Sequence, residues 1–109
     1  MKSIDAIIAL LENARYSDFT IDEEISRVTG IWNGEEMDVP SFTSNLNDAR
    51  SISNWLLVYA SDIGADGLAL ATLADPGYSP PLEATGMHSS LEIALCIAGL
   101  KARQLDEGK

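Results

Sequence analysis

The sequence predicts a single α+β domain, and two patterns indicate this class. Near both ends of the chain, apolar residues recur every three or four positions, which is the spacing of amphipathic helices. In the middle, two apolar runs at residues 55–60 and 68–73 flank a segment rich in Asp and Gly, which is typical of a β-hairpin. Ala and Leu are weak strand formers, so a helix is the alternative for the second run. We therefore expect about four helices packed on a small antiparallel sheet centred on residues 55–73. The 109 residues suffice for one domain and are too few for two of ordinary size.

The first two helices are expected near residues 3–14 and 20–29. The apolar stripe of the first helix consists of Ile4, Ile7, Ile8, Leu11 and Ala14. Ser3 is placed to cap this helix, because a serine oxygen can accept a hydrogen bond from a free amide of the first turn. Thr20 and Glu23 have the spacing of a capping box, which predicts the start of the second helix.

A third, short helix is expected near residues 45–52, with Thr43, Ser44 or Asn45 as its N-cap. Residues 75–86 contain three of the four prolines and two glycines, so we expect a loop between the hairpin and the last helix.

The last helix is expected near residues 89–104 and contains the single cysteine of the chain. Ser89-Ser90-Leu91-Glu92 has the spacing of a second capping box at its start. Cys96 falls on the apolar side of this helix, so we expect it to be a small buried residue rather than a reactive thiol. A single cysteine also rules out an intramolecular disulfide.

The chain is acidic, with 17 acidic and 7 basic residues and a formal net charge of −10 at pH 7. This charge repels phosphate backbones and anionic lipids, so we expect neither a nucleic acid nor a membrane as a partner. No apolar stretch approaches the ~18 residues of a membrane span, and the N-terminal segment lacks a signal-peptide cleavage pattern. We therefore expect a cytoplasmic protein. Acidic clusters at residues 22–24 and 35–38 are expected on solvated surfaces, and could bind a divalent cation or a basic partner only if they met in space.

Four segments carry a family resemblance. They are the helix ending in Leu10-Leu11-Glu12, the helix opened by Ile21-Asp22, the central segment Pro40 to Ala49 with its Phe-Thr-Ser-Asn-Leu-Asn-Asp-Ala run, and the Ala- and Leu-rich closing helix from Ser90 to Arg103. In this order, the chain resembles the phage α-β-α sandwich domain family of short phage and prophage proteins. The resemblance implies an α-β-α sandwich-like fold and a viral origin. The family has no assigned biochemical activity, so the resemblance supplies no catalytic residue.

The best candidate site for a small phosphate or nucleotide lies at Thr43, Ser44 and Asn45, close to Asp48. If these residues begin a helix, its free amides attract an anion. An ordinary helix cap explains the same residues, and we favour that interpretation.

Arginine and aromatic side chains would complete a nucleotide site. Arg50, or else Arg27 or Arg15, would bind the phosphates, while Trp55 or Tyr78 would stack on the base. Tyr78 lies in a proline-rich loop, which makes it the aromatic residue most expected to be exposed. Aromatic residues more often fill a core or an interface, and we favour that role for most of them.

Catalytic and metal-binding patterns are weak. His88 precedes Ser89, but the acid that would orient a nucleophile–base pair is not identifiable, so we favour a structural histidine. Asp62 and Asp66 match the first and fifth positions of a calcium loop, but the twelfth position is Leu73, which has no carboxylate. A hairpin turn explains the two aspartates better. We expect no cofactor and no metal.

The sequence therefore favours a non-enzymatic binding protein of phage origin over an enzyme. Such a protein would sequester a small ligand, in the sharpest version a nucleotide signal of host defence, or block a host protein. The alternatives are a small hydrolase that degrades a nucleotide and a structural accessory protein of phage assembly. We expect a homo-oligomer formed through the hairpin or the last helix, because helices over so small a sheet leave one edge or face to be covered.

Overall fold

A computed structural model of the chain describes residues 3–34, 36–61, 67–77 and 81–107. Within these residues it contains four helices and one three-stranded antiparallel sheet, which confirms the predicted α+β class. The elements are α1 (Ile4–Asn13), α2 (Phe19–Thr29), α3 (Leu46–Arg50), β1 (Leu56–Ser61), β2 (Ala69–Asp75), β3 (Leu82–His88) and α4 (Leu91–Glu107).

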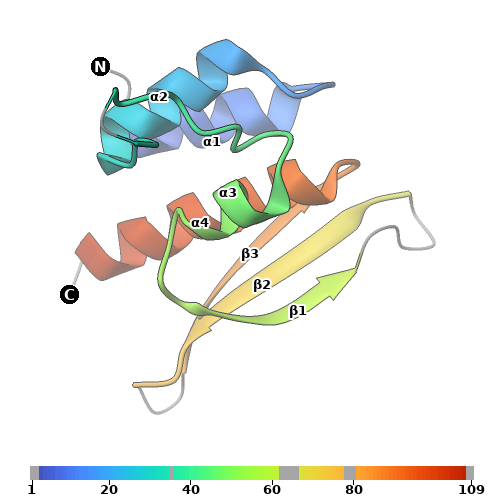
Figure 1. Ribbon diagram of the computed structural model, residues 1–109. Helices are drawn as coiled ribbons and strands as arrows, with labels where there is room; N and C mark the ends of the chain where they lie inside the picture. Colours follow the sequence, from blue (N-terminus) through green and yellow to red (C-terminus); the bar gives the residue numbers. More distant parts are fainter. Residues whose placement is uncertain (1–2, 35, 62–66, 78–80, 108–109) are drawn as a thin grey trace.

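The elements are stacked in three layers (Figure 1). The first layer is the sheet, with strand order β1-β2-β3 and both neighbouring pairs antiparallel. The second layer is α4, which packs on one face of the sheet with α3 beside it. The third layer is formed by α1 and α2, on the far side of α4. In the part of the chain that the structure describes, no helix covers the opposite face of the sheet.

α4 is buried on several sides because it lies between the sheet and α1. Every residue from Ile93 to Leu100 is buried, which an amphipathic surface helix could not show. The Ser90 hydroxyl accepts a hydrogen bond from the Ile93 N–H at 3.3 Å, so Ser90 rather than Ser89 caps the helix, which runs to Glu107. Among the described helices, none combines the length and the apolar character that a membrane span needs.

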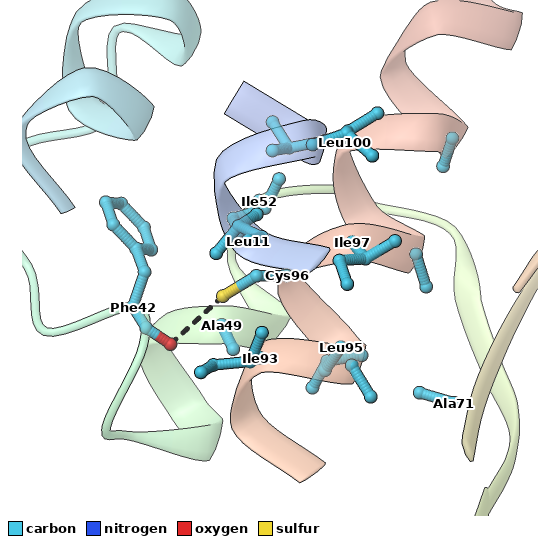
Figure 2. Packing of buried hydrophobic residues seen from close by; sticks show 14 of the residues in the cluster. Leu11, Phe42, Ala49, Ile52, Ala71, Ile93, Leu95, Cys96, Ile97 and Leu100 are labelled. Atoms are coloured by element: carbon cyan, nitrogen blue, oxygen red, sulfur yellow. Dashed lines mark hydrogen bonds between the residues drawn. The ribbon is translucent and has the colours of Figure 1, made fainter. Parts of the chain in front are cut away.

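The core lies around α4, and Figure 2 shows part of it. The Cys96 thiol is buried there and donates to the backbone oxygen of Phe42 at 3.1 Å. Burial raises the pKa of the Cys96 thiol well above its ordinary value, so the thiol stays protonated. This confirms the prediction that Cys96 is buried.

The two N-terminal helices follow their predicted ranges closely. Ser3 caps α1, as predicted, by accepting a hydrogen bond from the Ala6 N–H at 3.2 Å. The predicted cap of α2 is wrong, because Asp18 rather than Thr20 is its N-cap. The Asp18 carboxylate accepts from the Thr20 N–H at 2.8 Å and from the Thr20 hydroxyl at 2.5 Å, so α2 begins one residue earlier than expected.

The predicted loop at residues 75–86 is wrong in its second half, where the chain forms β3. This strand pairs with β2 along its whole length, from Leu82 opposite Asp75 to His88 opposite Ala69. Its inward residues Ala84 and Gly86 are small and have low strand propensity, but they let α4 pack closely on the sheet. Packing against α4 therefore decides the structure of this segment.

β1 contains a β-bulge at Val58, where the register shifts between Leu57 and Tyr59. In a regular strand, Leu57 and Ala60 would point to opposite faces, because side chains alternate. The extra residue places both opposite inward residues of β2, while Leu56 and Tyr59 pair with outward ones. The bulge thus aims Leu57 and Ala60 together under the helical layer.

Candidate functional site

A cavity of about 240 Å³ lies between α3, β1 and the start of α4, and we call it the α3–β1 cavity. Most of its wall is aliphatic and consists of Leu57, Ala60, Ala71, Leu91 and Leu95. The space remains because α4 lies mainly over β2 and β3, whereas only the short α3 lies near β1. Figure 2 shows Leu95 on the side of α4 that faces Ala71, whose small side chain does not fill the gap.

The open side of the cavity carries polar groups from α3. Arg50 and Asn47 line the cavity and are exposed, beside the partly exposed Leu46. Within the described residues, the Arg50 guanidinium has no hydrogen bond and no carboxylate partner. By contrast, Arg27 pairs with two glutamates of α2, and Arg103 donates to the backbone oxygen of Ile52. Arg50 is therefore a positive group available to a ligand at the mouth of an apolar cavity.

Of the six residues predicted to bind a ligand, Arg50 lies at this cavity. Asn45 is the N-cap of α3, accepting a hydrogen bond from the Asp48 N–H at 3.0 Å, so the cap interpretation holds for this residue. Ser44 is exposed and Thr43 is buried, and neither lines the cavity. The structure does not gather Thr43, Ser44 and Asn45 around one space.

The two predicted aromatic residues do not join Arg50 at the cavity. Trp55 is buried, and its indole N–H donates to the Asp106 carboxylate at 3.1 and 3.2 Å, which ties the start of β1 to the end of α4. Tyr78 lies outside the described residues. The walls that would hold the apolar part of a ligand are leucine and alanine side chains, which sequence reasoning did not identify.

His88 has a structural position. It is buried, its Nε2 is 2.5 Å from the Ala14 backbone oxygen, and its Nδ1 accepts from the Ser90 N–H at 2.9 Å. This pattern fits a neutral imidazole protonated on Nε2, which joins β3 to the end of α1 and to the cap of α4. With both ring nitrogens bonded to backbone groups, this histidine is not placed to activate Ser89.

The predicted metal-binding patterns are not assembled in the described residues. No group of three or more His, Cys, Asp or Glu side chains there is placed to hold a metal ion. The acidic clusters at residues 22–24 and 36–38 therefore do not meet as a cation site. Asp62 and Asp66, which match part of a calcium loop, lie outside the residues that the structure describes.

Comparison with protein-family models, with curated proteins and with solved structures finds no match to this chain. The resemblance to the phage α-β-α sandwich domain family remains a prediction. The functional conclusion therefore depends on the geometry of the α3–β1 cavity.

Thr43 joins the segment before α3 to α2. Its N–H donates to Oδ1 of Asp22 at 2.9 Å, and its Oγ1 accepts from the Asp18 N–H at 2.9 Å. The hydroxyl and N–H of Thr20 lower the pKa of Asp18, whereas burial raises the pKa of Asp22, which is 5% exposed. The pKa values of these two aspartates, which are four residues apart, are therefore shifted in opposite directions.

The raised pKa of Asp22 predicts an uncommon pH dependence. The stability that its shift contributes is fully present below the ordinary value of 3.8 and is lost as pH rises through the folded-state value. We expect Asp22→Asn, which keeps an acceptor for the Thr43 N–H but carries no charge, to be more stable than the natural chain at pH 7. The difference should vanish below about pH 4, where Asp22 is protonated.

Asp22→Ala is the matched control for this prediction. It removes the acceptor as well as the charge, so it should cost about 1–3 kcal/mol by leaving the buried Thr43 N–H unpaired. Urea unfolding of the three proteins between pH 3.5 and 7 measures both effects. An Asn variant less stable than the natural chain at pH 7 would show that the charge of Asp22 stabilises the fold.

Proposed function

We propose that this protein is a non-enzymatic binding protein that sequesters a small anionic ligand with an apolar part. The ligand's apolar part would enter the α3–β1 cavity, and its anionic group would bind Arg50. The observation that carries the proposal is Arg50, which lines the aliphatic cavity, is exposed and has no ion pair or hydrogen bond of its guanidinium among the described residues. Such a combination of apolar walls and one well-placed polar group is typical of small-molecule sites.

The cavity size restricts the ligand. Its 240 Å³ lies just below the range of about 300–1,000 Å³ found for sites that enclose drug-sized ligands. A ligand would therefore insert one group of roughly the size of a nucleobase or a short aliphatic chain and leave the remainder outside. A nucleotide fits this description when its base enters between the leucines and its phosphate meets Arg50. In this version, aliphatic side chains replace the predicted aromatic stacking.

The biological setting is part of the same proposal. The resemblance to phage proteins supports a role against host defence in the host cytoplasm. The proposed ligand in that role is a nucleotide signal. The net charge of −10 argues against binding to nucleic acids. We further propose that the protein acts as a homo-oligomer.

Native mass spectrometry with a panel of cyclic and linear nucleotides and with octanoate tests the proposal. We expect one unmodified ligand per chain. Arg50→Gln should weaken binding about tenfold to a hundredfold, because a hydrogen bond to a charged group contributes about 1.5–3 kcal/mol. Ala60→Leu should also weaken binding by filling the cavity.

Arg27→Gln is the matched control, because it removes an arginine that pairs with Glu23 and Glu24 on α2 and does not line the cavity. Its affinity for the ligand should equal that of the natural chain. Binding that survives both cavity substitutions would place the ligand elsewhere. A ligand released in altered form would instead indicate an enzyme, and no retained ligand would favour a host protein or a virion protein as the partner.

A further inference from the structure

The sheet has an exposed apolar face. We call this surface the open face and define it as the outward-pointing side of β1, β2 and β3, opposite α4. Three of its large side chains are about half exposed, with 54% for Leu56, 52% for Tyr59 and 54% for Met87. Side chains of this size leave on the order of 100 Å² of apolar surface each. Together they expose on the order of 300 Å², which is comparable with the largest apolar patch of a typical monomer, a patch that is often functional.

The charge of the open face is low compared with that of the chain. Among the described residues that point outward from the three strands, Glu83 is the one charged residue, whereas the chain carries a net charge of −10. A basic partner would find almost no carboxylate to bind there. Two copies of an acidic chain, however, can approach most closely through a surface that carries few like charges.

The polar groups at the centre of the open face are already paired. Thr72 of β2 lies opposite Thr85 of β3, and their hydroxyl oxygens are 3.0 Å apart. Because the two hydroxyls can bond to each other, covering them with an apolar surface would not leave both without a partner. This part of the face can be buried at a small desolvation penalty.

The area of the open face indicates a weak affinity. Strands lie about 4.8 Å apart and rise about 3.3 Å per residue, so a three-stranded sheet of this length presents a face of roughly 10 by 20 Å before side chains are added. A standard interface buries about 800 Å² on each partner. Before side chains are added, the open face supplies roughly a quarter of that area, so we expect a weak dimer that dissociates at micromolar or higher concentrations.

We propose that the open face is covered by the open face of a second copy of this chain, in a two-fold symmetric dimer. The two sheets pack face to face about 10 Å apart, as in a β-sandwich, and the helical layers lie outside. The last helix, which sequence reasoning offered as an alternative interface, is buried within its own chain from Ile93 to Leu100. The sheet is therefore the surface through which the copies associate.

Sedimentation equilibrium from about 5 to about 500 µM protein tests this proposal. The natural chain should change from monomer to dimer in this range. Tyr59→Glu and Met87→Glu should each raise the dissociation constant at least tenfold, because each places like charges across the two-fold interface. Tyr16→Glu is the control, since Tyr16 is 78% exposed in the α1–α2 connection, away from the sheet, and this variant should dimerise normally.

A second measurement keeps the proposal testable if a glutamate variant does not fold. Backbone amide chemical shifts of the natural chain should depend on concentration mainly at outward-pointing residues of the three strands. A natural chain that stays monomeric throughout the range would overturn the proposal. So would a dimer that both glutamate substitutions leave intact, or concentration-dependent shifts confined to the helices.

Discussion

Gly86→Ala should prevent the protein from folding stably. Gly86 is buried on β3 directly under α4, where the two backbones nearly touch. A Cβ atom at this position would overlap the backbone oxygen of Ala94 and lie 2.8 Å from the backbone nitrogen of Ala98 and 2.9 Å from the Cβ of Ile97. These are atoms of the helix itself or next to it, so no side-chain rotation relieves the overlap.

The expected loss exceeds about 4 kcal/mol, which is a large part of the roughly 5–15 kcal/mol that stabilises an ordinary domain. Urea unfolding followed by circular dichroism measures it. Gly77→Ala is the control, because the nearest atom to its new Cβ is a side-chain oxygen of Asp75 at 3.2 Å. We expect a change within about 1 kcal/mol for that variant. If Gly86→Ala unfolded at the same urea concentration as the natural chain, α4 would have to lie farther from β3.

Phe42→Ala should give the second largest effect. Phe42 is completely buried and is the largest such side chain among the residues that the structure describes. Its backbone oxygen also accepts the Cys96 thiol, so the segment before α3 is joined to α4 at this point (Figure 2). Replacing a buried phenylalanine by alanine typically costs about 3–5 kcal/mol, because transfer energy is lost and a cavity remains.

With a urea m-value near 1.5 kcal/mol/M, this loss lowers the midpoint of unfolding by about 2–3 M. Phe42→Leu is the matched control, since it keeps most of the apolar volume and should lose less than half as much. Equal effects of the two substitutions would mean that the aromatic ring, rather than buried volume, is what the site requires.

The helices could be predicted because their signals are local. Apolar spacing and a nearby capping residue define α1 and α2 within a few positions, and Ser3 caps α1 as expected. β3 could not be predicted in this way, because its inward residues Ala84 and Gly86 do not favour a strand by themselves. They become favourable only against Ala94 and its neighbours on α4, and this contact exists only once the helix has packed on the sheet.

The candidate site was only partly predictable for a similar reason. Arg50 could be named because an arginine is a recognisable anion ligand in any acidic sequence. Leu57 and Ala60 could not be assigned to one wall, because a regular alternation separates residues three positions apart. The bulge at Val58 brings them together, and no residue type in this strand indicates that a bulge forms there. Thr43 could be named as a candidate ligand-binding residue from its residue type alone. Its hydrogen-bond partners at α2, however, are some 20 residues away in sequence.

β1 has a different neighbour on each of its two sides. Its inward residues Leu57 and Ala60 line the α3–β1 cavity, while its outward residues Leu56 and Tyr59 belong to the open face. If the proposed ligand and the proposed second copy both bind, they contact this strand from opposite sides, so any gain in order of β1 caused by one would reduce the entropy loss of the other. Such a coupling is reciprocal. Ligand capture would then rise more steeply than in proportion to the amount of protein, so a cell in which the protein accumulates would pass from little capture to nearly complete capture over a narrow range of expression.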